Sequence, residues 1–204
     1  MKEALSQFHS NIERTRTLIA IHNSVEASTT KVLDTSDMLR SAIVMAVSAL
    51  DHYVHEVVRF GMLEISRRQR PTTDAFLKFD VSLESVRQMS VDPLDELWLE
   101  NEIRRRHNWQ SFESPDRIAD AIRLISDTKL WDVVAVKLGH SSVGVKKELS
   151  VVIDRRNKIA HEADVDPSFP GTRWPIDDRM VIDVVTFIEQ VGNGIHHALT
   201  SQTP

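Results

Sequence analysis

The helical character of this chain is most evident in residues 149–164, which read LSVVIDRRNKIAHEAD. Residues at steps of three and four lie on one face of a helix, and two such faces can be followed here. The first is apolar apart from one arginine and consists of Leu149, Val152, Arg156, Ile159 and Ala163. The second is wholly polar and consists of Ser150, Asp154, Asn157, His161 and Asp164. The pattern predicts an amphipathic helix from about Ser142 to Ala163.

Arg156 and His161 carry the chemistry of this helix. Arginine is permanently cationic and fits a phosphate geometrically, and histidine exchanges a proton near neutral pH, so the pair suits the cleavage of a phosphodiester. Because an unpaired arginine is costly to bury, Arg156 must meet an acid, line a cleft or contact a second chain. Asn157 shares a face with His161, whereas Arg156 is offset from it by roughly 140°. The plainer interpretation is a salt-bridged arginine and a histidine at a helix end.

The rest of the chain also follows helical patterns nearly throughout. The other expected helices run from about residue 3 to 27, from Asp34 or Ser36 to before Pro71, from Ser114-Pro115 to about 125, from 127 to 138, and from an Asp177 cap to about 195. Residues 71–115 are expected to form an insertion of short helices, with a longer one near 94–109, and residues 165–176 a loop. Four long helices plus this insertion predict an all-α bundle, and we interpret residues 1–204 as a single domain.

Composition narrows the class of protein. The chain of 204 residues contains no cysteine, which excludes disulfides and thiolate metal sites and fits a reducing cytosol. Residues 1–8 lack the apolar core of a signal peptide. The longest apolar run, residues 42–47, is far too short to span a bilayer. A soluble cytoplasmic protein that does not use a membrane is therefore expected.

The charge pattern bears on nucleic-acid binding. The formal net charge of −5 argues against non-specific binding of nucleic acid, which normally uses a basic face. Any contact with RNA would have to use local basic clusters, which lie at residues 67–70, 104–107, 146–147 and 155–156.

The second long helix has a polar side that complements the first pattern. Asp51 and His55 are four residues apart, as are His52 and Glu56, so each carboxylate can orient an imidazole. Solvated ion pairs are the plainer interpretation. These residue types also fit a metal-dependent hydrolase, but no remote third ligand is indicated, and we expect no metal and no cofactor.

In these residues and their spacing the chain resembles the HEPN-domain proteins. Their hallmark is Arg-x4-6-His, often with Asn, Asp or His directly after the arginine, and the segment from Arg156 through Asn157 to His161 fits it. Arg155 also falls within the allowed spacing. The resemblance is closest to the RiboL-PSP-HEPN branch and covers about residues 35–198, with matching segments at 48–57, 109–112, 149–164 and 173–176.

The resemblance implies a four- to five-helix bundle that forms a homodimer, in which two motifs face one another in a composite active site. Many members are metal-independent endoribonucleases, and members serve in toxin–antitoxin, phage-defence and RNA-processing systems. By this resemblance His161 would act as general acid or base for attack of a ribose 2′-OH, Arg156 would bind the phosphate, and Asn157 would orient either group. The products would be a 2′,3′-cyclic phosphate and a 5′-OH. Asp51, His55 and Arg155 are secondary candidates for the same cleft.

Other readings of the same residues remain open. A HEPN domain that has lost activity would serve in dimerisation or in binding nucleotides or RNA. A toxic half of a two-component system would have an antitoxin or another regulatory protein as partner.

Overall fold

The expected all-α fold is confirmed. The computed structural model describes residues 1–29, 33–92, 97–107, 111–169 and 171–201. Within these residues there are nine α-helices and no β-strand, only an isolated bridge between Val165 and Arg173. The helices are α1 (Lys2–Ser28), α2 (Ser36–Ser66), α3 (Asp74–Leu77), α4 (Leu83–Val91), α5 (Leu97–His107), α6 (Pro115–Arg123), α7 (Leu130–Leu138), α8 (Ser142–Glu162) and α9 (Asp178–Thr200).

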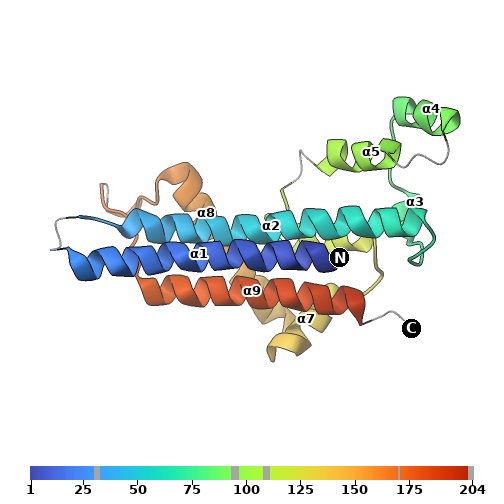
Figure 1. Cartoon of the computed structure of the whole chain (residues 1–204). Helices are drawn as coiled ribbons and strands as arrows, with labels where there is room; N and C mark the ends of the chain where they lie inside the picture. Colours follow the sequence, from blue (N-terminus) through green and yellow to red (C-terminus); the bar gives the residue numbers. More distant parts are fainter. Residues whose placement is uncertain (30–32, 93–96, 108–110, 170, 202–204) are drawn as a thin grey trace.

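Three long helices, α1, α2 and α9, lie side by side at the centre of the bundle (Figure 1). The helices α2 and α9 run in the same direction, and α1 runs opposite to both. Their facing sides bury large apolar residues, among them Phe8, Ile12, Ile43, Tyr53, Val57, Ile188 and Ile195. The helix α8 packs against α2 and α7, and its buried residues are Val145, Leu149, Val152 and Ile153. The core therefore fixes α8, the helix that carries the Arg-x4-His segment.

Several helix ends are set by capping residues that can be recognised in the sequence. Ser114 caps α6 by accepting the N–H of Arg117 at 3.2 Å, with proline at the first helical position. Asp177 caps α9 by accepting the N–H of Met180 at 2.8 Å. Gly139 ends α7 with a φ of 71°, a left-handed conformation that glycine adopts without steric cost.

Other predicted boundaries were wrong by a few residues. The cap of α2 is Thr35, between the two expected candidates, and Asp34 instead accepts the N–H of Ser36 through its side chain at 2.9 Å. The helix expected from residue 127 begins only at Leu130. Of the longer helix expected near 94–109, the described part is α5, and residues 94–96, 108 and 109 lie outside the described residues.

The insertion forms short helices, as expected. The hairpin of α4 and α5 lies on the outer side of α2, away from α1 and α9 (Figure 1). Leu99 and Ile103 of α5 are buried, and α5 packs on α2. The insertion therefore packs on α2, and after the insertion the chain continues to α6.

The carboxyl end of α8 reverses sharply. Ala163 and Asp164 both adopt left-handed backbone conformations, with φ of 52° and 59°, and the N–H of Asp164 bonds to the carbonyl of Lys158 at 3.0 Å. The chain then enters the expected loop, in which the bridge between Val165 and Arg173 joins the two sides. This reversal lies directly after His161.

Candidate active site

Arg156 meets an acid. Its Nη1 lies 2.6 Å from Oε1 of Glu113, and it donates to the side-chain oxygen of Asn157 at 2.8 Å. The arginine side chain is 13% exposed and that of Glu113 is 28% exposed. The Nε of Arg156 is buried and has no hydrogen-bond partner among the described residues. Of the three possibilities that the sequence leaves for this arginine, the single chain shows the first.

The helix α2 holds the segment that carries Glu113. Asp51 accepts the backbone N–H of Phe112 at 2.7 Å through Oδ1. The other oxygen of Asp51 lies 3.6 Å from Nε2 of His55, and the rings of His55 and Phe112 have centroids 4.4 Å apart. Phe112 itself is buried in the core. The two secondary candidates of α2 therefore position the residue next to Glu113.

The charges around Glu113 keep it ionised. A hydrogen bond from Ser111, another from Arg156 and the positive charges of Arg156 and His161 lower the pKa of Glu113 below its ordinary value of 4.5, against the opposing effect of burial. His161 is exposed on the last turn of α8. The guanidinium of Arg156 thus contacts the carboxylate, and the imidazole on the same helix also acts on this carboxylate electrostatically.

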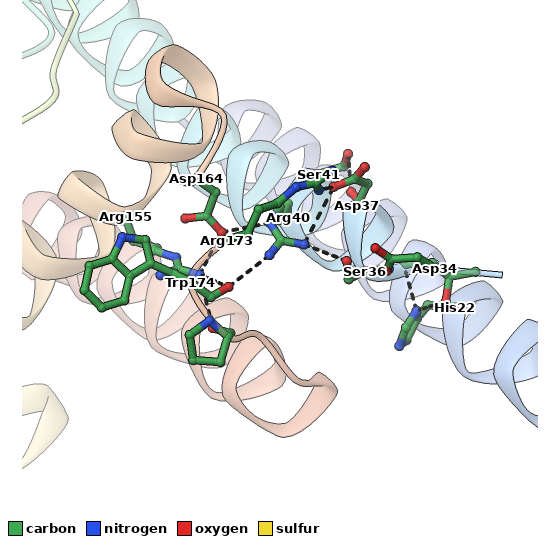
Figure 2. A network of polar contacts seen from close by, with 12 residues as sticks. His22, Asp34, Ser36, Asp37, Arg40, Ser41, Arg155, Asp164, Arg173 and Trp174 are labelled. Atoms are coloured by element: carbon green, nitrogen blue, oxygen red, sulfur yellow. Dashed lines mark hydrogen bonds and ion pairs between the residues drawn. The ribbon is translucent and has the colours of Figure 1, made fainter. Parts of the chain in front are cut away.

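Arg155 belongs to a different cluster of polar contacts (Figure 2). Its Nη2 donates to Asp164 at 2.8 Å and to the carbonyl of Pro175 at 3.2 Å. The same Asp164 oxygen accepts from Nε of Arg40 at 2.8 Å, and Arg40 also donates to the carbonyl of Trp174 at 3.0 Å. Burial, and then the charge of Arg40, lower the pKa of Arg155, whereas Asp164 raises it. This cluster joins α8, α2 and the loop before α9.

The position predicted for Asp164 from the sequence pattern was wrong. It stands in the polar stripe of the predicted helix, but the structure buries its side chain completely and places it beyond the helix end. Its second oxygen has no hydrogen-bond partner among the described residues. The backbone reversal carries Asp164 from the solvent side to the junction with α2.

The basic cluster of α5 is paired with acids. Arg104 donates to Glu100 at 2.9 Å, Arg105 pairs with Glu102, and Nη1 of Arg106 lies 3.5 Å from Asp80. Ser82 and Ser85 also donate to Glu102, the latter at 2.7 Å. The cluster therefore presents less positive charge than its sequence indicates.

The histidines and acids of α2 were also weighed as metal ligands. Across the described ranges no group of three or more His, Asp or Glu side chains is arranged to hold a metal ion. Glu56 pairs with Arg59 at 2.7 Å, and Asp51 accepts the backbone hydrogen bond described above. Within the same ranges no helix is long and apolar enough to cross a membrane.

Sequence patterns missed Glu113 and Arg40. Glu113 directly precedes the Ser114 cap, and its place is set by the hydrogen bond between Asp51 and Phe112. Neither contact follows from periodicity, because the partners are distant in sequence. The signals available were the uncompensated Arg156 on an apolar stripe and the acid at the end of the insertion.

The helical bundle and the Arg-x4-His segment on α8 define a HEPN-domain protein. The family model of RiboL-PSP-HEPN matches residues 9–201, so the chain belongs to this family. The match extends beyond the region of the sequence resemblance and includes most of α1. Comparisons with curated proteins and with solved structures gave no significant match. Membership of the HEPN family suggests a nuclease or RNA-binding role in general.

Proposed function

We propose that this protein is a metal-independent endoribonuclease. The observation that carries the proposal is the contact of Arg156 with both Asn157 and Glu113, on the helix whose last turn also carries His161. A guanidinium stabilises the charge that develops on a phosphate during displacement. An imidazole at the end of the same helix supplies or accepts a proton.

The reaction is an attack of the ribose 2′-OH on the neighbouring phosphorus. A bond forms between O2′ and phosphorus, and the bond from phosphorus to O5′ breaks. One proton leaves the 2′-OH and one proton reaches the 5′-oxygen, so the products are a 2′,3′-cyclic phosphate and a 5′-OH end. His161 takes part in one of these transfers, and Asn157 holds the guanidinium of Arg156 through its amide oxygen. Because the nucleophile is the 2′-OH, the substrate is RNA.

We include in the proposal a homodimer in which two copies of α8 form a composite active site. We also place the enzyme in the cytoplasm, in a defence or toxin–antitoxin system, with an antitoxin or regulatory protein as partner. Membership of the HEPN family supports these points. Their tests are the mass of the protein in solution and the toxicity of its expression, relieved by His161→Ala.

The test of the chemistry is cleavage of single-stranded RNA in the presence of EDTA. We expect wild-type protein to cleave and to leave 2′,3′-cyclic phosphate ends, and His161→Ala to be slower by about 10²-fold or more. Arg156→Ala should lose a comparable amount. Matched controls are His140→Ala and Arg14→Ala, which change exposed residues elsewhere. Equal cleavage by wild type and His161→Ala would refute the proposal.

One observation favours a second candidate, an inactive module that binds RNA or nucleotides. The carboxylate of Glu113 already binds the guanidinium of Arg156, which a phosphate would need. An inactive module would bind single-stranded RNA without cleaving it, and Glu113→Gln would tighten that binding. The cleavage assay paired with a binding measurement separates the two functions.

A further inference from the structure

Glu113 is the acidic residue directly before the Ser114 cap of α6. Its carboxylate is partly exposed and lies on Nη1 of Arg156 at 2.6 Å. Three elements fix it there: Asp51 of α2 holds the N–H of Phe112, Arg117 of α6 donates to the carbonyl of Ser111 at 3.3 Å, and α8 supplies the guanidinium. A carboxylate bound to an arginine marks a place where a phosphate oxygen can bind, since both anions take the same donors.

We propose that Glu113 is the general base that takes the proton from the ribose 2′-OH, and that His161 is the acid that protonates the departing 5′-oxygen. This inference rests on the endoribonuclease function proposed above and assigns a catalytic residue outside the Arg-x4-His segment. Each chain then contributes a phosphate binder, a base and an acid to the composite active site.

The chemistry balances without a further reactant. The proton of the 2′-OH moves to the carboxylate of Glu113 as the bond from O2′ to phosphorus forms. The proton of the His161 imidazolium moves to the 5′-oxygen as its bond to phosphorus breaks. Arg156 stays charged and binds the non-bridging oxygens throughout. Proton exchange with water restores both groups after product release.

Substrate binding strengthens this base. In the free protein the pKa of Glu113 is lowered, first by Ser111 and then by Arg156, so the carboxylate is ionised and ready to accept a proton. A bound phosphodiester takes donors from Arg156 and brings a negative charge close to the carboxylate. Both effects raise the pKa of Glu113. A base with a higher pKa accepts the 2′-OH proton more readily.

The charged and titratable groups around this carboxylate act on it either directly or through the segment that carries it. The helix α8 contributes Arg156 and His161. The helix α2 contributes Asp51 and His55, through Phe112. The helix α6 contributes Arg117, through Ser111. The acidic limb of the pH profile can be assigned to Glu113 only if replacing this one carboxylate removes the limb.

The first test is the pH dependence of cleavage by wild type, Glu113→Gln and Glu113→Asp, with Glu148→Gln on the exposed side of α8 as the matched control. Activity of wild type should fall at low pH as Glu113 gains a proton. Because kcat/KM reports the free enzyme and kcat the complex, the acidic limb of kcat should lie at higher pH. Glu113→Gln should lose the acidic limb and about 10²-fold or more in kcat with KM unchanged or lower, and Glu113→Asp should retain the limb.

A second test separates the base from the acid. A uridine 3′-(4-nitrophenyl phosphate) has a leaving group that departs without a proton, so it needs a base but no acid. His161→Ala should cleave this ester at nearly the wild-type rate, whereas Glu113→Gln should be as impaired as on RNA. Circular dichroism of each variant shows whether it is folded, and the conservative Glu113→Asp variant gives the answer where Glu113→Gln does not fold.

The outcomes distinguish this inference from the function on which it rests. If wild type cleaves RNA, His161→Ala does not, and Glu113→Gln retains full activity with an unchanged acidic limb, only the role of Glu113 is overturned. Faster cleavage by Glu113→Gln would overturn it too and make Glu113 a competitor of the phosphate. If wild type cleaves no RNA, both proposals fail.

Discussion

The substitution Asp164→Asn tests whether the buried cluster at the end of α8 stabilises the fold. Asparagine keeps the shape of the side chain and tolerates the left-handed backbone of this position, so the change removes mainly the charge. The Asp164 side chain is fully buried and accepts from Arg40 and Arg155, each at 2.8 Å. After the change, Arg40, whose side chain is 8% exposed, loses its buried counter-ion and keeps only the exposed Asp37, 3.6 Å away.

The expected loss follows from the removal of the buried partner of Arg40. Removing one partner of a buried ion pair costs about 3–5 kcal/mol, a large part of the roughly 5–15 kcal/mol that keeps a typical domain folded. For a chain of this length we expect the melting temperature to fall by about 6–20 °C. Thermal and urea unfolding followed by circular dichroism measure the effect.

The control is Asp154→Asn on the solvent side of the same helix. Asp154 pairs with Lys158 at 2.9 Å and its side chain is 64% exposed, so its loss should cost less than about 1 kcal/mol. Adding Arg40→Met to Asp164→Asn should recover part of the stability, because it removes the buried charge. The reasoning would be refuted if Asp164→Asn and Asp154→Asn lost the same small amount.

Three more substitutions test other parts of the structure. Gly61→Ala should lose about 1–3 kcal/mol of unfolding free energy, because its Cβ would lie 2.7 Å from Ile125; unchanged urea unfolding would contradict the close packing. The pKa of Glu102 is lowered to about 2, first by Arg105, so this carboxylate stabilises the fold above pH 4.5 and the contribution is lost as the pH falls toward 2. The difference in melting temperature between wild type and Glu102→Gln should therefore shrink over that interval, and a constant difference would contradict it. Asp51→Ala, which removes the acceptor of the Phe112 N–H, should slow RNA cleavage more than Asp51→Asn, which keeps an acceptor; equal rates would separate α2 from the reaction.

The helices could be predicted because their signals are local. Ser114 followed by Pro115, Asp177 before an apolar repeat, and Gly139 after one each act within a turn of their own position. The start of α2 was less predictable, because Asp34, Thr35 and Ser36 are all residues that cap helices, and the choice among them depends on how the chain enters the bundle.

The contacts of the insertion depend on the fold and were not predictable. The run of arginines at 104–106 has the composition of a phosphate-binding patch, but each lies beside an acid of the same region. Glu102 lies within this run of charge and is nevertheless buried, because two serines at the start of α4 donate to it. Periodicity gives the face of a helix, whereas the partner of a charged side chain is set by a segment that packs there from elsewhere.

The adjacent arginines on α8 are the clearest case in which the partners of charged side chains could not be predicted. Both Arg155 and Arg156 fit the spacing to His161, and although the apolar face singles out Arg156, it does not give the partner of either arginine. A helix turns by about 100° per residue, so the two side chains leave α8 in different directions. Arg155 reaches the buried Asp164, and Arg156 reaches the partly exposed Glu113.

These two arginines give the end of α8 separable functions. The cluster of Arg155 lies beyond His161 and joins the helix to α2, so a change there should lower stability and act on cleavage only through the fold. The pair of Arg156 and Glu113 is partly exposed, so a change there should alter the pH profile of cleavage while the protein stays folded. A variant of Asp164 with full stability and a lost acidic limb, or one of Glu113 that unfolds with an unchanged limb, would reverse this assignment.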